Sequence, residues 1–225
     1  MSLSQRAIEY LKTLNRNPDW ITEEQETNGY LKNLEIGNFD NISNTQLKYS
    51  GYELTVNNDD RFTYEINFIS KYHIEKNKRI YTERVNDEII FDFENNKKSY
   101  YYFITESGRI CTKNEDSPRE IHYSFDKIET KIEQFALLNE FYYFKAFPST
   151  NWNVTDFEKL KNELSDFEQI PECCDSFNFC CKNDQVLILI SPWIGSTGKF
   201  LSIYGIDNSF SQKIISRLEK KYVIE

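Results

Sequence analysis

The spacing of apolar residues changes along the chain, and this change predicts the order of its elements. Near the N-terminus apolar residues recur every three or four positions, as on one face of a helix. They are Leu3, Ala7, Ile8, Leu11 and Leu14. We therefore expect an amphipathic helix over residues 3–15, ended by the segment from Asn15 to Pro18. Residues 20–46 have isolated apolar positions, and we expect one short helix around 27–35.

From residue 52 onward the period becomes two, which is typical of strands with one buried face. Apolar residues alternate at Tyr52, Leu54 and Val56, and again at Phe62, Tyr64, Ile66 and Phe68. The segment from Asn57 to Asp60 between them is rich in residues that tolerate turn geometry, so it predicts a hairpin. Further strands are expected at residues 79–85, 89–93, 100–105 and 109–112. Together these segments predict an antiparallel meander of five to six strands from about residue 47 to 112.

The second half of the chain returns to helical spacing. Ser124 is a plausible N-cap for a helix that runs to about Leu138 and buries Ile128, Ile132, Phe135 and Ala136. Capping boxes at 155–158 and 209–212 predict the starts of two more helices. Strands are expected between those helices, near residues 176–181, 185–191 and 200–206. We therefore predict the element order α-β-β-β-α for the C-terminal portion.

Helices that segregate from an antiparallel sheet define an α+β fold. A chain of 225 residues is long enough to bury about 70% of the surface that its unfolded form exposes. We expect a single domain over residues 1–225. Pro148 and Ser149 open a loop, so a candidate sub-domain boundary lies near 148–153 and divides residues 1–148 from 154–225.

The net charge of the chain indicates which classes of partner it can bind. The chain has 27 Lys and Arg against 36 Asp and Glu, a net charge of −9, which argues against nucleic-acid binding. The segment from Lys97 to Tyr102 interleaves bases and rings as single-strand binders do, but the start of a strand after a polar turn explains it better. An acidic surface suits a basic protein partner through electrostatic steering, with solubility as the simpler explanation.

Segments that target or anchor proteins are not evident in the sequence. Charges interrupt the N-terminal apolar pattern early, unlike a signal peptide. The longest aliphatic run, Val186–Ile190, is far too short to span a membrane. The five cysteines are odd in number and clustered, which is unlike a disulfide framework. We therefore expect a cytoplasmic protein without membrane contact.

Four of the cysteines lie in the segment "PECCDSFNFCC", residues 171–181. Structural zinc sites usually take Cys pairs separated by two to four residues, whereas these pairs are adjacent and no histidine lies nearby. Adjacent residues on a strand point to opposite faces, so the simplest interpretation is a structural role in which one cysteine of the Cys180–Cys181 pair lies in the core as a small hydrophobic residue. Metal binding by Cys173, Cys174, Cys180 and Cys181 is the first alternative, and redox or nucleophilic chemistry is the second.

The segment "SPWIGSTGKF", residues 191–200, resembles a phosphate-binding loop but fails its spacing. The first required glycine would fall at Trp193, and the required hydroxyl would fall at Phe200. A strand rather than a helix follows, so no helix N-terminus would face an anion. We interpret the segment as a glycine-rich loop between antiparallel strands, and expect no cofactor.

Acid–base chemistry has no clear location in the sequence. His73 is expected on the polar face of a strand, and His122 is expected just before a helix. A Cys111–His122 dyad has no motif to support it. The charges of residues 156–172 predict a solvated helix face, or alternatively an acidic patch for a basic partner. They are Asp156, Glu158, Glu163, Asp166, Glu168 and Glu172 against Lys159 and Lys161.

Residues 99–140, "SYYYFITESGRICTKNEDSPREIHYSFDKIETKIEQFALLNE", resemble the strand, glycine turn, strand, loop and "SF" helix segment of SMI1/KNR4-like (SUKH) proteins. That superfamily is α+β, and many bacterial members are immunity proteins that bind and neutralise a cognate toxin. The resemblance covers under a fifth of the chain and gives no site residues to carry over. Residues 150–225 have no counterpart in it.

These observations lead to one function hypothesis and two alternatives. The leading hypothesis is a non-catalytic acidic protein-binding module of the immunity type. The first alternative is a small hydrolase or transferase with a carboxylate or cysteine site. The second is a zinc-stabilised interaction domain built on the cysteine cluster.

Overall fold

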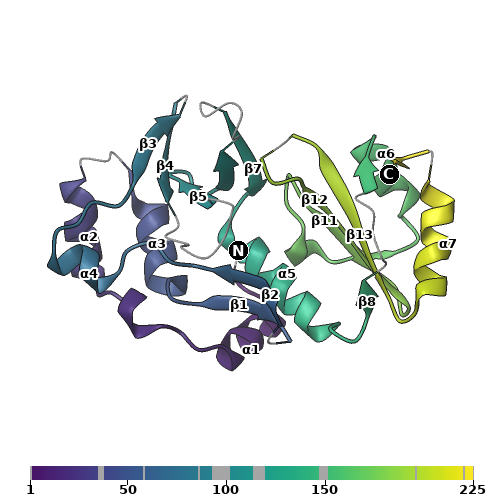
Figure 1. Ribbon diagram of the computed structural model, residues 1–225, viewed down its shortest axis with the longest axis horizontal. Helices are drawn as coiled ribbons and strands as arrows, with labels where there is room; N and C mark the ends of the chain where they lie inside the picture. Colours follow the sequence, from purple (N-terminus) through teal and green to yellow (C-terminus); the bar gives the residue numbers. More distant parts are fainter. Residues whose placement is uncertain are drawn as a thin grey trace.

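Two lobes meet along one helix, α5 (Ile128–Glu140), in the computed structural model (Figure 1). The structure describes residues 2–34, 38–57, 59–85, 87–92, 102–113, 120–146, 152–195, 197–219 and 221–224. The N lobe holds the elements before α5, and the C lobe holds those after it. An α+β fold with an antiparallel meander packed against helices is confirmed.

The N lobe begins with helices. These are α1 (Gln5–Thr13), the 3-10 turn η1 (Pro18–Trp20), α2 (Glu24–Asn33) and α3 (Asp40–Tyr49). Helix α1 lies within the predicted residues 3–15, and the hydroxyl of Ser4 caps it by accepting from the backbone N–H of Ala7 at 3.2 Å. The sequence analysis did not predict helix α3, because this helix buries polar as well as apolar residues. The buried amide of Gln46, for example, donates to the carbonyls of Trp20 and Ile69 and accepts from the N–H of Ile69.

The predicted meander is a five-stranded antiparallel sheet, but its bounds differ from the expectation. It runs in the order β3 (Thr82–Val85), β4 (Glu88–Asp92), β5 (Tyr102–Thr105), β6 (Ile110–Lys113) and β7 (Ile121–Phe125). The first predicted hairpin, β1 (Glu53–Val56) and β2 (Asp59–Glu65), forms a separate two-stranded sheet. Helix α4 (Lys71–Glu75) separates the hairpin from the meander.

The placement of His73 on a strand is wrong, since it lies in α4 and is only 2% exposed. A reciprocal cap explains the helix. The Ser70 hydroxyl accepts from the His73 N–H at 3.3 Å, and Nδ1 of His73 accepts from the Ser70 N–H at 3.1 Å. These two bonds satisfy backbone donors at the helix start, which alternation alone does not reveal.

The C lobe contains the predicted α-β-β-β-α order with short strands added. Its main elements are α6 (Phe157–Glu163), β11 (Phe179–Lys182), β12 (Val186–Pro192), β13 (Lys199–Gly205) and α7 (Asn208–Leu218). The added ones are β8 (Lys145–Ala146), β9 (Trp152–Val154), β10 (Glu168–Gln169), η2 (Pro171–Cys173) and β14 (Val223–Ile224). The sheet order is β10-β11-β12-β13-β9-β14, and β8 also pairs with β13.

Three predicted helix caps are wrong. Ser124 lies in β7, and α5 follows Lys127 instead. Asp156 caps α6 by accepting from the N–H of Lys159, and Asp207 caps α7 by accepting from the N–H of Ser209. In each of the last two cases an aspartate near the predicted hydroxyl cap takes the role, because a carboxylate accepts strongly from the first turn of a helix.

A shared core lies between the lobes. Leu137 and Phe144 from the α5 side pack against Ile170, Cys173, Cys180, Leu187 and Leu189 of the C lobe. The N lobe and the C lobe each have a further core of their own. The candidate boundary near 148–153 falls mostly outside the described residues, and β8 before it and β9 after it both pair with β13. No helix in the described part of the chain is long and apolar enough to cross a membrane.

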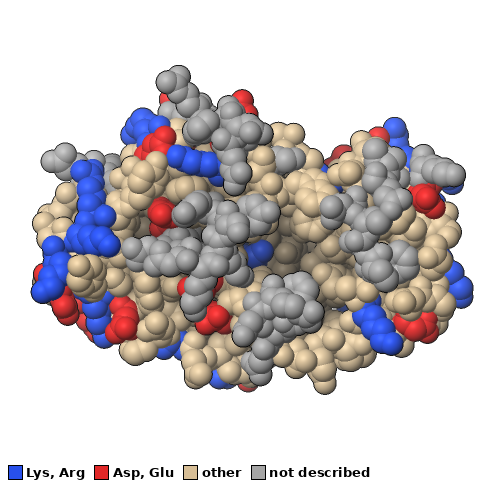
Figure 2. All heavy atoms as spheres, viewed as in Figure 1, with Lys and Arg blue, Asp and Glu red and all other residues tan. Residues whose placement is uncertain are grey.

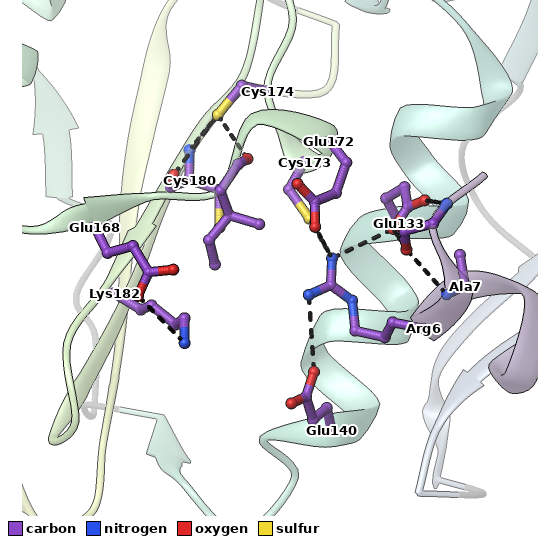
Figure 3. A network of polar contacts seen from close by, with 12 residues as sticks. Arg6, Ala7, Glu133, Glu140, Glu168, Glu172, Cys173, Cys174, Cys180 and Lys182 are labelled. Atoms are coloured by element: carbon purple, nitrogen blue, oxygen red, sulfur yellow. Dashed lines mark hydrogen bonds and ion pairs between the residues drawn. The ribbon is translucent and has the colours of Figure 1, made fainter. Parts of the chain in front are cut away.

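An ion network at Arg6 ties three elements together across this seam. Figure 3 shows the Arg6 side chain reaching from α1 to carboxylates of α5 and η2. Its Nη2 lies 3.3 Å from Glu133 and 3.0 Å from Glu172, and its Nη1 lies 3.7 Å from Glu140. Burial alone would lower the pKa of Arg6, but Cys173 and the three carboxylates raise it above its ordinary value. We call this group, Arg6 with Glu133, Glu140 and Glu172, the Arg6 clamp.

Polar contacts at two other places also cross the seam. The backbone N–H of Asp126 donates to Asp175 at 3.0 Å, and the N–H of Ser176 donates to Asp126 at 2.9 Å. The side-chain amide of Asn178 donates to the carbonyl of Ser124 at 2.7 Å. The N–H of Gly195, whose φ of 71° favours glycine, donates to the Thr112 hydroxyl at 3.0 Å.

Breaking the Arg6 clamp is expected to destabilise the fold. Glu133 is only 3% exposed, so Arg6→Met leaves a buried carboxylate without its cation, at a cost of about 3 kcal/mol. Urea unfolding at neutral pH measures this loss. The control is Lys12→Met, which removes an exposed pair with Glu9 and should cost less than about 1 kcal/mol. Adding Glu133→Gln to Arg6→Met should recover part of the loss, and equal costs for the two single variants would contradict the clamp.

Candidate functional site

The two adjacent cysteines of β11 point to opposite faces of the C-lobe sheet, as the sequence predicted. Cys180 pairs with Leu189 and belongs to the core between the lobes. Cys181 pairs with Ile188 and belongs to the core of the C lobe. Both are fully buried, whereas the sequence analysis placed one of the two in the core. They act as small core residues on two sides of one strand.

Cys173 and Cys174 lie where η2 meets β11, near Cys180 (Figure 3). The Cys174 sulfur donates to the carbonyl of Ile170 at 3.2 Å and accepts from the N–H of Cys180 at 3.2 Å. Within the described residues, no group of three or more His, Cys, Asp or Glu side chains is arranged to hold a metal ion. The four sulfurs of this segment therefore do not form a ready ligand set.

Four of the thiols, those of Cys111, Cys174, Cys180 and Cys181, have raised pKa values that favour the protonated form. Burial raises the pKa of Cys111 and of Cys181 to about 12 each. A hydrogen bond with Cys173, together with burial, raises the pKa of Cys180 well above its ordinary value. Burial also raises the pKa of Cys174. Because the thiolate is the nucleophile and the metal ligand, these shifts disfavour both kinds of chemistry at neutral pH.

The structure does not form a Cys111–His122 dyad. Cys111 pairs with Tyr123 and His122 pairs with Thr112 across β6 and β7, so the two side chains lie on opposite faces of the sheet. The placement of His122 in front of a helix is wrong, since it lies within β7. His73 is buried and committed to its capping contacts with Ser70.

The segment 191–200 is a loop between antiparallel strands, as predicted. Strand β12 ends at Pro192, β13 begins at Lys199, and the N–H of Trp193 donates to the carbonyl of Gly198 at 2.9 Å. The tip of the loop reaches the N lobe through the contact of Gly195 with Thr112. Trp193 and the 41% exposed Ile194 line a cleft between the lobes.

We call this feature the seam cleft, and its volume is about 460 Å³. Figure 2 shows the surface hollowed where the lobes meet. One wall is a stripe of α5 at helical spacing, formed by Lys131, Gln134, Phe135 and Leu138. The facing wall is one face of β12 and β13 with the loop between them, formed by Leu189, Ser191, Pro192, Trp193, Ile194, Phe200, Ser202 and Tyr204. Tyr102, Ser124 and Phe125 of the N-lobe sheet complete the lining.

Small residues explain why the seam opens at this point. On the cleft-facing side of the C-lobe sheet, Leu189 pairs with Ser202 and Ser191 pairs with Phe200. The same face carries Leu187 and Leu189 in the core shared with α5. The opposite face has large aliphatic residues at the matching level, namely Ile188, Ile190, Leu201 and Ile203. Serine side chains at 191 and 202 leave space in front of α5, so the shared core ends and the cleft begins.

The described lining of the seam cleft is mainly apolar and carries one cation. Lys131 is the one charged residue among its described lining residues, which include no Asp, Glu, His or Cys. The Lys131 ammonium lies 4.7 Å from the centre of the Phe125 ring, 4.9 Å from that of Tyr64 and 5.3 Å from that of Phe135. Such stacking on ring faces stabilises a cation in apolar surroundings. The lining offers no acid–base pair for hydrolysis.

The carboxylates of residues 156–172 are all in ion pairs, which favours the solvated face over an acidic docking patch. Each of the six carboxylates has a cation within 4 Å. The pairs are Asp156–Lys159, Glu158–Lys161, Glu163–Arg217, Asp166–Arg217, Glu168–Lys182 and Glu172–Arg6. The cations from Arg217, Lys182 and Arg6 come from other elements, so the local sequence did not reveal them.

A second acidic group, which the sequence did not single out, lies at the start of α2. Asp19, Glu23, Glu24 and Glu26 are exposed, and none of them forms an ion pair within the described part of the chain. The exposed Tyr72 is on α4, which contacts α2, and the Lys78 ammonium lies 5.6 Å from the centre of its ring. We call these five residues the α2 corner. Helices α2 and α4, which carry most of it, lie side by side at the end of the N lobe farthest from the seam (Figure 1).

Comparisons of the chain with protein-family models, with curated proteins and with solved structures gave no match. The seam cleft and the α2 corner are therefore interpreted from their own geometry. The stripe along α5 and the alternation in β13 are both visible in the sequence, but nothing local indicates that the two faces meet. The α2 corner is defined by exposure and ion pairing. Both depend on tertiary contacts, so the local sequence does not reveal them either.

The buried thiols are expected to resist alkylation in the folded protein. Iodoacetamide attacks thiolates, and burial with a raised pKa leaves Cys111, Cys180 and Cys181 both inaccessible and protonated. Mass spectrometry after brief labelling at pH 8 should find these three unmodified, and labelling in denaturant should modify all five cysteines. Rapid native labelling of Cys180 or Cys181 would show that one of them is a reactive thiol.

Proposed function

We propose that the protein is a non-catalytic module that binds a basic protein partner in the cytoplasm, and that it acts as an immunity-type protein. The observation that carries this proposal is the contrast between its two acidic groups. The carboxylates of residues 156–172 are matched by cations of the same chain, whereas those of the α2 corner form no ion pair with the residues that the structure describes. Carboxylates without internal partners are available to cations of another molecule.

The physical basis is electrostatic recognition with an aromatic anchor. A net charge of −9 steers a basic partner toward the protein, and the carboxylates of the α2 corner, which have no cation partner among the described residues, give it a place to dock. Tyr72 on the neighbouring helix α4 is 55% exposed, and tyrosine is enriched at the centres of protein interfaces. Part of the acidity also stabilises α2, because negative side chains favour the N-terminus of a helix.

The resemblance to SMI1/KNR4-like proteins supports the immunity role. The described part of residues 99–140 comprises the hairpin of β5 and β6, strand β7 and helix α5. This arrangement fits the strand, glycine turn, strand and helix of the resembling segment. The five free thiols fit a reducing cytoplasm, where disulfides are rare.

A hydrolase or a transferase is less well supported. The seam cleft is lined mainly by apolar and aromatic side chains, and its lining residues present one ammonium group and hydroxyl groups but no carboxylate or thiol. Such a site can hold a ligand, yet it lacks the paired groups that acid–base or nucleophilic catalysis uses. The zinc-stabilised alternative would need sulfur ligands that converge, whereas Cys180 and Cys181 point to opposite faces of their strand.

Two charge-matched triple variants test the proposal. Glu23→Gln, Glu24→Gln and Glu26→Gln neutralise the α2 corner, and Glu158→Gln, Asp166→Asn and Glu168→Gln remove the same charge from the paired group. Quantitative capture from a lysate of the source organism should enrich a basic protein with the wild type and the second variant, and much less with the first. Three exposed contacts of about 0.5 kcal/mol each predict about tenfold weaker binding for the first variant in a titration with that partner.

The outcome that contradicts the proposal is equally concrete. If the two triple variants weaken capture equally, net charge rather than the α2 corner determines binding. If no protein is reproducibly enriched at low salt, where electrostatic attraction is strongest, the protein is not a binder of basic partners.

A further inference from the structure

We infer that the seam cleft binds a neutral amphipathic ligand, an aromatic or aliphatic compound that carries a hydroxyl or an N–H donor. Two buried polar side chains, Gln134 and Ser124, carry this inference, because they line the cleft with hydrogen-bonding groups that the described chain leaves unused. The cleft lies at the seam, far from the α2 corner, and the inference does not rest on the proposed partner. Its volume of about 460 Å³ falls in the usual range of small-molecule sites, about 300–1,000 Å³.

The site is built into the fold. Its two main walls are α5 and the β12–β13 pair, and the shared core joins these walls beside the cleft. The Arg6 clamp fixes α5 against α1 and η2. A ligand would therefore enter a preformed space, which lowers the ordering cost of binding.

The side chain of Gln134 supplies the cleft with a hydrogen-bond acceptor. It is only 5% exposed, and its nitrogen donates to the carbonyl of Cys173 at 3.1 Å, which identifies the other end of the amide as the oxygen. Within the described residues this oxygen, Oε1, accepts no hydrogen bond. A carbonyl oxygen can only accept, so the ligand group that pairs with it must be a donor. Because a buried polar group without a partner is costly, a ligand that supplies the donor gains affinity.

The hydroxyl of Ser124 is the second unused group. The residue is 6% exposed, and its backbone carbonyl accepts from Asn178 at 2.7 Å, whereas its hydroxyl forms no hydrogen bond within the described residues. A hydroxyl both donates and accepts, so it can donate to the oxygen of a ligand hydroxyl whose own proton goes to Gln134. Strand β7 and helix α5, which carry these two side chains, pack against each other.

The walls select an apolar body. Leu138, Phe135 and Phe125 line the N-lobe side, and Leu189, Phe200 and Trp193 line the opposite side. The Trp193 and Phe200 rings pack together, with centres 4.9 Å apart, and form an aromatic edge to the cleft. Burying the chain or ring of a ligand between these surfaces removes apolar area from water on both sides.

The charges of the lining favour a ligand without a charge of its own. The described lining residues include no carboxylate that could pair with a cation. The ammonium of Lys131 lies over the rings of Phe125, Tyr64 and Phe135 and has a further interaction within the protein, so we assign its charge to those contacts and not to a ligand. An ionised group that enters apolar surroundings without a counter-ion loses far more hydration free energy than a hydroxyl does.

Three probes with the same propylphenyl body test this assignment on the full chain at neutral pH. They are para-propylphenol, its methyl ether para-propylanisole and the anion para-propylbenzoate, each titrated into the protein by isothermal calorimetry. The phenol is expected to bind with a Kd below about 1 mM. The ether and the anion are expected to bind at least about tenfold more weakly, because neither can donate to Gln134. Binding of either one as tightly as the phenol, or no binding of the phenol up to about 1 mM, would overturn the inference.

Variants then locate the site. Gln134→Met keeps the size of the side chain and removes the acceptor, so it should weaken phenol binding by about tenfold and leave ether binding unchanged. The preference for the phenol over the ether should therefore disappear. Ser202→Leu fills the cleft and should abolish binding of both. The control is Gln212→Met, since Gln212 is exposed on α7 and should leave both affinities unchanged.

Folding of the variants is checked by circular dichroism and thermal melting, because Gln134 also joins α5 to η2. If Gln134→Met or Ser202→Leu does not fold, Ser191→Leu serves in its place, since it adds volume on the same face of the sheet. A folded Gln134→Met that keeps the wild-type preference for the phenol would show that Gln134 does not recognise it. Unchanged phenol binding by a folded Ser202→Leu or Ser191→Leu would show that binding occurs elsewhere.

Discussion

The position of the two lobes relative to each other depends on the ion pairs of the Arg6 guanidinium. It comes from the first helix, and its carboxylate partners come from α5 and from η2, more than a hundred residues further along the chain. Glu133, almost fully buried, also accepts from the N–H and the hydroxyl of Ser4, so the start of α1 is fixed against the middle of α5. A buried carboxylate strongly requires such partners, and this requirement makes α1, α5 and η2 one rigid group.

Beside that rigid group, the seam between the lobes is closely packed in one part and open in another. Where large aliphatic residues and Cys180 face α5, the lobes share a dry core. Where Ser191 and Ser202 replace large residues on the same sheet face, the same two walls stay apart and leave the seam cleft. The cleft thus follows from side-chain size at two strand positions rather than from a separate element. The α2 corner lies at the other end of the N lobe, so the two surfaces can serve different ligands.

The sequence predicted those features that depend on local periodicity. The N-terminal helix, the antiparallel meander and the C-terminal α-β-β-β-α order follow from apolar spacings of 3.6 and 2. Helix α3 was missed because Gln46 and other polar residues are buried in it, and α4 because the Ser70–His73 cap interrupts an apparent strand. The opposite orientation of Cys180 and Cys181 could be predicted, since it requires only strand geometry. The pairing of Arg217, Lys182 and Arg6 with the acidic residues 156–172 could not, because these partners are distant in sequence.

If the Arg6 clamp and the shared core make one unit of the two lobes, the whole chain should unfold in a single step. Differential scanning calorimetry measures this directly, by comparing the calorimetric enthalpy of unfolding with the van't Hoff enthalpy from the shape of the transition. The account predicts one transition in which the two enthalpies agree. Two resolved transitions, or a calorimetric enthalpy about twice the van't Hoff value, would show that the lobes unfold independently and that the seam does not hold them together.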